Sequence, residues 1–335
     1  MSIHKCPAVF LGILIALAGT SVFAQIPINT CNPVTTPPVG SLLQSPGNYI
    51  LNANLTSSAA ADCIKITASN VSLKLNGKSI KYTGVALPPL DVNNPYPFAG
   101  IRVASAAPSL SPCSGTVTSR LCRIGIEGQG VIQGFPTGIL MIKVDASQVD
   151  LVTLLQNQYG LVGGDVVSLT VASNVIGRSA YEGLRLDGPT SSVVAHNDVS
   201  GNGTTTSPDY SGHGIDITCA SICSGVAKDN TVNNNTADGN GLDGIKISTH
   251  VFGYLLGTRV YGNVTDGNGR YGIEVGYGGM DLAGTQVFNN TSLCNISGDL
   301  YDDSTDNGVG GVTGCNQNFW SSNAFFTARP TTCVH

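Results

Sequence analysis

The chain has 335 residues, of which 42 are glycine and only 11% are charged, and its formal net charge is −5. This mild acidity, without a basic patch, argues against nucleic acid or an anionic membrane as a partner. The 41% of hydrophobic residues is enough to fill a core and excludes a disordered chain. Abundant glycine with few charges favours turns and strands over long solvated helices.

The first 24 residues have the pattern of an export signal. Met1–Lys5 give a basic start, Ala8–Val22 a short apolar run, and Val22-Phe23-Ala24 a small-residue cleavage site. No comparable apolar run follows, so we expect no membrane span. The sequence therefore predicts a protein that is secreted, periplasmic or displayed at the cell surface.

Ten cysteines fit an oxidising compartment, and nine remain once Cys6 leaves with the signal. The pairings considered are Cys219–Cys223, Cys113–Cys122, Cys31–Cys63, and Cys294 with either Cys315 or Cys333. No C-x-x-C pair has a matching His or Cys partner. We therefore expect structural disulfides and no metal site of the zinc type.

A glycine followed by apolar-any-apolar recurs from residue 100 to residue 275. The copies begin at Gly100, Gly138, Gly160, Gly183, Gly214, Gly244 and Gly272, at intervals of 38, 22, 23, 31, 30 and 28 residues. The shortest intervals set the minimum repeat, and the others indicate the same repeat with inserted loops. Alternation within Gly244-Ile245-Lys246-Ile247 predicts strands with isoleucine inside and lysine outside.

Asparagines recur in step with these strands. Each of the first series follows a valine by three residues, and four are followed five residues later by another: Asn174, Asn197, Asn235, Asn263 and Asn290, then Asn202, Asn240, Asn268 and Asn295. Short-strand repeats cannot each bury a core, so they must stack as coils. The asparagines are predicted to lie one above another at turns and to hydrogen bond along the stack. We prefer this role to glycosylation for the sequons at Asn54, Asn70, Asn263 and Asn295.

This pattern resembles the right-handed parallel β-helix proteins of the pectate-lyase-like group, and within it the NosD-like repeat proteins. Gly47–Thr56 and Ala68–Ile80 are similar to the opening coils of that group. The resemblance implies an all-β, right-handed parallel β-helix solenoid over residues 61–300, with an N-terminal cap at 25–60 and a C-terminal cap at 301–335. The aromatic residues of the second cap are expected to form a lid over the last sheet edge: Phe319, Trp320, Phe325 and Phe326.

Residues that face outward on the repeated strands should form one row. In order they are Arg102, Leu140, Val162, Arg185, Asp216, Lys246 and Glu274. The last four alternate in charge, and loops expected at 204–211, 218–225, 249–257 and 277–284 would flank them as walls of a groove for an extended polymer. The same alternation is also typical of a structural ladder of salt bridges that needs no ligand. Both interpretations stay open.

Gly212-His213-Gly214 is similar to the Gly-His-Gly motif of polygalacturonase-type glycoside hydrolases, and Gly244-Ile245-Lys246 matches two residues of that family's Arg-Ile-Lys. The resemblance implies that His213 supports catalytic carboxylates and that Lys246 binds a substrate carboxylate. The family's Asn-Thr-Asp and Asp-Asp segments have no counterpart, so other aspartates would have to supply the acid and base. The predicted catalytic residues are His213, Asp216, Lys246 and Asp187, and the predicted substrate-binding residues are Glu182, Arg185, Asp243, Tyr271 and Glu274.

The expected function is to bind, and to process as a lyase, hydrolase or epimerase, an extracellular or cell-wall polysaccharide. A lyase or epimerase needs a base and a group that neutralises a carboxylate. Residues of these types are expected on adjacent coils, namely Arg185, His213, Lys246 and Tyr271, although the Asp-Pro-His-Asp signature of alginate epimerases is absent. The alternative is a non-catalytic surface or structural repeat protein. A NosD-like role in metal-centre assembly is a third hypothesis, against which the lack of a His/Met cluster counts. No cofactor is expected, except that Asp302–Gly308 resembles half a calcium loop.

Overall fold

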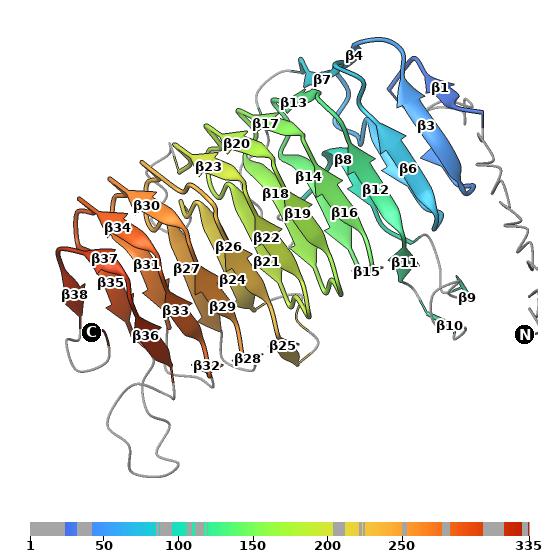
Figure 1. The fold of residues 1–335 in the computed structure, drawn as a ribbon. Helices are drawn as coiled ribbons and strands as arrows, with labels where there is room; N and C mark the ends of the chain where they lie inside the picture. The colour runs from blue at the N-terminus through green and yellow to red at the C-terminus, as the bar shows by residue number, and fades with distance from the viewer. Residues whose placement is uncertain are drawn as a thin grey trace, which may run out of the picture.

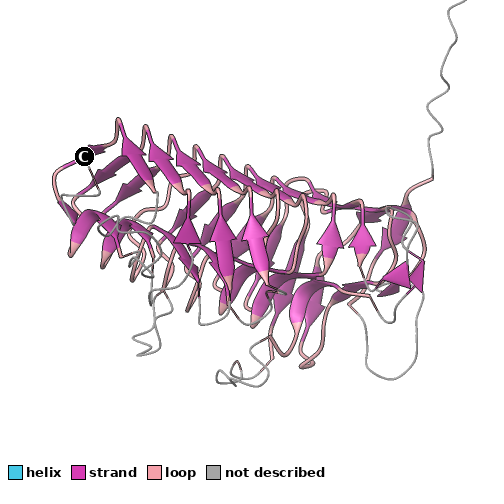
Figure 2. Cartoon of the chain, turned by 90° about the horizontal axis from the view of Figure 1, so that it is seen from below, coloured by secondary structure: helices cyan, strands magenta, loops and turns pink. Residues whose placement is uncertain are grey.

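The computed structural model describes residues 24–31, 42–84, 87, 96–105, 109–110, 117–118, 120–203, 212–220, 223, 225–249, 253–276, 282–303, 318–329 and 334. These residues form short strands and turns and no helix. The chain is a right-handed parallel β-helix, as predicted, and its coils advance steadily from the N-terminal to the C-terminal end (Figure 1). Figure 2 shows the strands of successive coils stacked along one axis.

Two long parallel sheets, each of eleven strands, form two faces of the solenoid. Sheet A contains β1 (Ile26–Ile28), β3 (Gly47–Leu51), β6 (Val71–Lys74), β12 (Ile124–Glu127), β16 (Gln148–Asp150), β19 (Thr170–Ala172), β22 (Val193–Ala195), β26 (Thr231–Asn233), β29 (Arg259–Tyr261), β33 (Gln286–Phe288) and β36 (Phe319–Ser321). Sheet B contains β2 (Leu42–Leu43), β5 (Ile64–Ile66), β8 (Ala99–Val103), β14 (Thr137–Ile142), β18 (Tyr159–Gly164), β21 (Leu184–Asp187), β24 (Ile215–Cys219), β27 (Ile245–Thr249), β31 (Tyr271–Val275), β35 (Gly298–Asp302) and β38 (Ala328–Arg329).

The remaining strands form a third face and short ladders between the faces. The third face has β4 (Leu55–Ser57), β7 (Ser79–Tyr82), β13 (Val131–Gln133), β17 (Thr153–Leu155), β20 (Val175–Gly177) and β23 (Asp198–Ser200), then β30 (Val264–Asp266), β34 (Thr291–Leu293) and β37 (Ala324–Phe325). The short ladders are β11 (Leu121–Cys122) with β15 (Val144–Asp145), β25 (Val226–Lys228) with β28 (Tyr254–Leu256) and β32 (Leu282–Ala283), and the antiparallel pair β9 (Ser109–Leu110) and β10 (Val117–Thr118).

The core is built from inward rows in which equivalent residues of successive coils pair directly. One row of sheet A runs Leu73, Ile126, Val149, Val171, Val194, Val232, Val260, Val287 and Trp320, and all of these are buried. β-branched residues suit this place because they pack well on a pleated surface. The segments expected to be caps, 25–60 and 301–335, also contribute strands to these sheets.

Of the aromatic residues expected to form a lid, Trp320 lies in the core. It ends the valine row, and its Nε1 donates to Asp302 Oδ2 at 2.9 Å. Phe319 and Phe326 are instead 56% and 76% exposed. Phe319 is exposed because it pairs with Gln286, which belongs to the outward row of sheet A.

Two asparagine ladders run through the turns, as predicted. In the first, each Nδ2 donates to the next Oδ1 at 2.9–3.0 Å, along Asn174, Asn197, Asn235, Asn263, Asn290 and also Asn323. In the second, Asn202, Asn240, Asn268 and Asn295 are joined at 2.9–3.1 Å. Sequons at Asn263 and Asn295 therefore have their amide nitrogens committed to the buried ladders.

The repeated glycines are required by close packing between coils. A Cβ on Gly183 would lie 2.6 Å from Asn202 Nδ2, and one on Gly214 would lie 2.6 Å from Asn240 Nδ2. No side chain fits at such distances, so the second ladder and the glycine repeat depend on each other. This explains why the repeated glycines and the asparagines of the second ladder recur at matching intervals along the sequence.

The disulfides follow the sequence-based pairing in part. Cys31–Cys63 and Cys219–Cys223 are bonded, and Cys122 is also in a disulfide, while its expected partner Cys113 lies outside the described residues. The pairing expected for Cys294 is wrong, because this residue is a free, exposed thiol. The export signal lies outside the described residues except for Ala24, and the described chain contains no helix able to cross a membrane.

Replacing Asn235 with alanine should destabilise the solenoid. Its Oδ1 accepts from the backbone and side-chain nitrogens of Asn197 at 3.0 and 2.9 Å, and its Nδ2 donates to Val194 O and Asn263 Oδ1. Because buried donors lose their partner, we expect a loss of about 2 kcal/mol or more in the free energy of unfolding. Urea denaturation followed by circular dichroism measures this. Asn233→Ala, two residues away and facing outward, should change it by less than about 0.5 kcal/mol, and equal effects would contradict the ladder's role.

Candidate functional site

The outward row of sheet B pairs as the sequence predicts. Arg102, Leu140, Val162, Arg185, Asp216, Lys246 and Glu274 are consecutive partners on neighbouring strands. The row begins earlier, at Leu42 and Lys65, and continues through Tyr301 to Arg329. Residues separated by 22 to 38 positions in the chain are therefore direct neighbours on one face.

The apolar part of the row is covered by the chain itself. Leu140 and Val162 are buried in a second apolar cluster with Ala99 and Tyr159. Tyr96 packs edge-on against Tyr159, with ring centroids 5.2 Å apart. These residues therefore form a small core on the outside of the sheet, and neither leucine nor valine is an open contact surface.

The charged part of the row is also buried, which corrects the expectation of an open strip. Asp216, Lys246 and Glu274 are only 4%, 5% and 1% exposed. Alternation along a strand decides on which side of the sheet a residue lies, but it does not tell what covers that side. Of the loops expected beside the row, residues 204–211, 250–252 and 277–281 lie outside the described residues.

Arg185 is the centre of the first group of charges. Its guanidinium lies 3.2 Å from Glu182, 3.8 Å from Asp216 and 3.9 Å from Asp187. Burial raises the pKa of Glu182, although Arg185 acts to lower it. Two atoms of this group, Arg185 Nε and Asp216 Oδ1, are buried without a hydrogen-bond partner. Asp187 and Asp216, both predicted to be catalytic, thus lie against the same arginine.

Arg270 and Asp243 are the centre of the second group. Arg270 Nε donates to Asp243 Oδ1 at 2.8 Å, and Arg270 Nη2 contacts both Asp243 Oδ2 and Glu274 Oε2. His213 Nδ1 lies 3.0 Å from Asp243 Oδ2, and Lys246 Nζ lies 4.0 Å from Glu274 Oε2. The structure thus brings together five residues from three neighbouring coils around one pair of carboxyl groups.

The two carboxyl groups of this pair have opposite shifts. Burial, with the neighbouring Asp243 carboxylate, raises the pKa of Glu274 to about 9. Burial also acts to raise the pKa of Asp243, but the hydrogen bonds from Arg270 and the contact with His213 outweigh it and lower that pKa. At neutral pH, Glu274 is therefore protonated and Asp243 ionised, which is the arrangement of an acid and a base.

Three residues beside this pair are partly exposed. The Arg270 side chain is 20% exposed, and Tyr271 and Tyr301 are half-buried. The two tyrosine rings are stacked with centroids 4.3 Å apart, and the Arg270 guanidinium lies 5.3 Å from the centre of the Tyr271 ring. Tyr271 also donates its backbone nitrogen to Asp243 Oδ1 at 3.0 Å.

Sequence reasoning missed Arg270 and Tyr301. Arg270 stands two residues before Gly272, outside the glycine-apolar-any-apolar strand in which outward residues were sought. Its position four residues before Glu274 was the available signal. Tyr301 lies beyond the last repeat of that pattern, although it pairs directly with Glu274.

The described residues contain no group of three or more His, Cys, Asp or Glu side chains able to hold a metal ion. Asp302, the first residue of the expected half calcium loop, accepts hydrogen bonds from Trp320 and Asn318. Asp303 accepts a hydrogen bond from the Tyr301 hydroxyl at 3.2 Å, and residues 304–308 of that segment lie outside the part of the chain that the structure describes.

Solved structures with a similar fold are phage tailspikes and a polysaccharide epimerase. The tailspike protein of E. coli bacteriophage HK620, in complex with pentasaccharide, is 14% identical over 90% of this chain and 57% of that chain, with a TM-score of 0.55. The enzymatically active domain of bacteriophage CBA120 tailspike protein 2 is 15% identical over 89% of this chain and 41% of that chain, with a TM-score of 0.54. The A-module of Azotobacter vinelandii mannuronan C-5 epimerase AlgE6 is 13% identical over 84% and 80%, with a TM-score of 0.50.

These likenesses establish the parallel β-helix fold. The chain spans only about half the length of the tailspikes it matches. No family model and no curated protein matches the sequence. The comparisons therefore define a class of architecture, and the activity must be argued from the residues on it.

Glu274 should make the stability depend on pH. Its pKa is 4.5 in an ordinary setting and about 9 when folded, so the folded state binds one proton more than the unfolded state between these values. The free energy of unfolding contributed by this group is therefore full below pH 4.5 and falls as pH rises towards 9. Glu274→Gln, which cannot ionise, should gain in Tm relative to the native protein as pH rises from 5 to 9.

Thermal unfolding at a series of pH values measures this difference. The matched control is Asp198→Asn, the same change at an exposed carboxyl group on the third face, which should follow the native curve. A Glu274→Gln variant whose Tm stays parallel to that of the native protein at every pH would show that Glu274 is ionised in the folded state.

Proposed function

We propose that this protein binds an acidic polysaccharide along the outer face of sheet B and processes it by proton transfer at Glu274 and Asp243. The observation that carries the proposal is the pair of touching carboxyl groups on neighbouring coils, one protonated and one ionised at neutral pH. Proton donors and acceptors with separated pKa values are typical of acid–base sites.

The cations beside the pair suit a carboxylate-bearing sugar. Arg270 and Lys246 lie against Glu274, and Arg185, on the coil before Asp216, lies 3.8 Å from that aspartate. A uronate carboxylate held by Arg270 would place its sugar ring next to the protonated Glu274. Cleavage of the glycosidic bond by either hydrolysis or elimination needs a proton on the leaving oxygen, and Glu274 is the group able to donate it.

Hydrolysis by two separated carboxylates is less well supported. Carboxyl groups of glycoside hydrolases stand about 5–5.5 Å apart in retaining enzymes and about 6.5–9.5 Å apart in inverting ones. Asp243 and Glu274 instead hydrogen bond to each other and share Arg270 Nη2. Elimination or epimerisation is therefore the favoured chemistry: the ionised Asp243, held by Arg270 and His213, would take the proton beside the uronate carboxylate, and Glu274 would donate its own proton.

Export is part of the same proposal. The two disulfides among the described residues support an oxidising compartment, and residues 1–24 have the composition of an export signal. A polysaccharide substrate is too large to enter most cells, so the enzyme and its substrate would meet outside the cytoplasm. The similar folds of a tailspike in complex with pentasaccharide and of an epimerase also support a carbohydrate ligand.

A non-catalytic structural repeat is the second candidate. It is favoured by the burial of the charged row, whose members largely neutralise one another. In this case the row stabilises the stacking of coils and no ligand is involved. Buried ion pairs alone are weak evidence for either role, because their desolvation offsets much of their attraction.

Turnover of acidic polysaccharides should depend on Glu274. Incubation with alginate and polygalacturonate is followed by reducing ends, by the absorbance of unsaturated uronates, and by NMR of the uronate epimers. Glu274→Gln should lower the rate by about 100-fold or more, because proton transfer is lost. Asp198→Asn should keep the native rate. If the native protein neither binds nor changes these polymers, the structural candidate is correct.

Lys246→Ala separates the two candidates. If Lys246 holds a substrate carboxylate, the variant should bind oligogalacturonate or oligoalginate about tenfold more weakly, as one charge-assisted contact is lost. If the row is only structural, the variant should show a lower Tm and unchanged binding. Isothermal titration below the Tm of the variant measures the affinity, and thermal unfolding measures the stability.

A further inference from the structure

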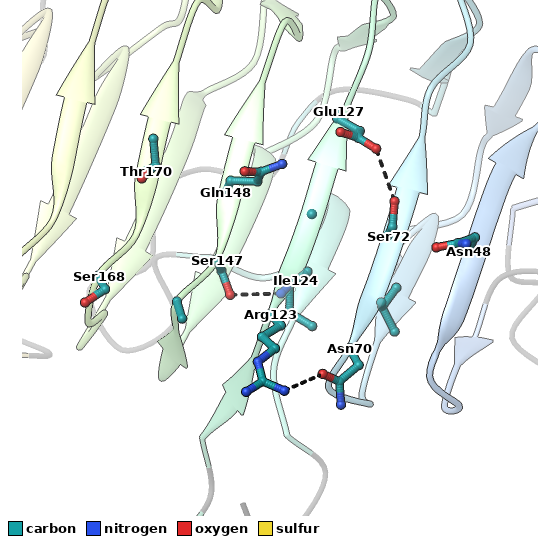
Figure 3. A pocket seen from close by; sticks show the side chains of 13 residues that line it. Asn48, Asn70, Ser72, Arg123, Ile124, Glu127, Ser147, Gln148, Ser168 and Thr170 are labelled. Carbon is teal, nitrogen blue, oxygen red and sulfur yellow. Dashed lines mark hydrogen bonds between the residues drawn. The ribbon is translucent and has the colours of Figure 1, made fainter. Parts of the chain in front are cut away.

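A groove lies on the outer face of sheet A, away from the charged row of sheet B. It has a volume of about 640 Å³, within the range of about 300–1,000 Å³ typical of ligand sites. Its floor follows the outward row Asn48, Ser72, Gly125, Gln148 and Thr170, which pair across five neighbouring strands (Figure 3). Four strand-to-strand steps of about 4.8 Å make the floor roughly 19 Å long.

Gly125, in the middle of this floor, has no structural reason to be glycine. Its backbone does not have a positive φ, and a Cβ added to it would meet nothing closer than 3.8 Å, the distance to Gln148 Nε2. The glycines of sheet B, such as Gly183 and Gly214, differ because an added Cβ would clash there. Glycine weakens a strand interior and often marks a place where a ligand approaches the backbone closely.

The groove offers hydrogen-bonding groups that the protein does not use. The side chains of Asn48, Gln148 and Thr170 make no hydrogen bond within the described chain. Amides and hydroxyls of this kind both donate and accept. They lie on three different strands, so a ligand would meet a new polar group at nearly every step along the floor.

The charges at the edges of the groove cancel. Arg123 and Glu127 lie at opposite edges (Figure 3). Arg123 donates to Asn70 Oδ1 at 3.4 Å, while Glu127 accepts from Ser72 at 3.2 Å and lies 4.0 Å from Lys74. No single-sign field exists to attract a strongly charged polymer. The fitting ligand is therefore uncharged, extended and rich in hydroxyl groups.

We propose that the groove on sheet A binds a neutral glycan chain, lying along the solenoid axis with its sugar rings over Gly125. This site is separate from the acidic-polysaccharide site proposed for sheet B, in both its face and its charge. One molecule would then hold two different glycans on two faces, which increases the overall affinity for a surface that carries both.

The test is isothermal titration of the full chain with neutral hexasaccharides of glucose, xylose and mannose. At least one should bind the native protein. Gly125→Ile, which fills the floor with a residue well suited to strands, should weaken that binding by about tenfold or more, and Gln148→Ala by about threefold or more. Thr231→Ile, on the same outward row but beyond the groove, is the matched control and should bind as the native protein does.

Thermal unfolding of each variant checks that the fold is kept, and Gly125→Ile should be at least as stable as the native chain. Lack of binding to all three neutral sugars, or native affinity in Gly125→Ile, would overturn the proposal. Glu274→Gln should bind the neutral sugar as the native protein does. Loss of neutral-glycan binding would therefore leave the proposal for sheet B intact, and absence of activity on acidic polysaccharides would leave the proposal for sheet A intact. Competition by hexagalacturonate for the same site would also overturn the assignment to a neutral glycan.

Discussion

The register between coils is the constraint on which the rest of this structure depends. Parallel strands that slip by one residue exchange their buried and exposed faces, and the solenoid has no long-range closure to prevent this. The asparagine ladders supply the restraint, because each buried amide accepts from the coil before it and donates to the coil after it. The repeated glycines add a second restraint, because a side chain at these positions would clash with the neighbouring coil. The two restraints together fix a single register between successive coils. Every row on the outside of the molecule inherits that alignment.

The same register concentrates charge in a way that a globular chain rarely does. Asp243, Lys246, Arg270 and Glu274 come from two consecutive coils, yet their titratable groups are in contact and largely shielded from water. Shielding makes ionisation of all carboxyl groups unfavourable, so one of them retains its proton. A scaffold built from repetition thus creates an uneven pair of acids from residues on neighbouring coils. The groove on sheet A arises from the opposite device, an omitted side chain in an otherwise regular row.

Features that recur once in every coil could be predicted from the sequence. The fold, both asparagine ladders and the pairing of Arg185, Asp216, Lys246 and Glu274 were predictable because each leaves a periodic trace. Burial of that row was not predictable, since period-two alternation carries no information about what lies above a sheet. Arg270 and Tyr301 fell outside the repeated phrase. Gly125 looked like one more glycine among 42, and only the space around it distinguishes it. The free thiol at Cys294 is likewise a feature that spacing along the chain does not give.

The valine row of sheet A has a consequence for how such a molecule can change in size. Val149, Val171 and Val194 occupy equivalent places on β16, β19 and β22, and each pairs with the next in the same parallel register. A whole coil inserted or deleted at this point would leave both neighbours with a matching partner. The chain can therefore be lengthened in units of one coil without redesign of its ends. The groove ends at β19 and the acid pair lies beyond β26, so the coil of Val194 lies between them and the solenoid works as an adjustable spacer between two surfaces.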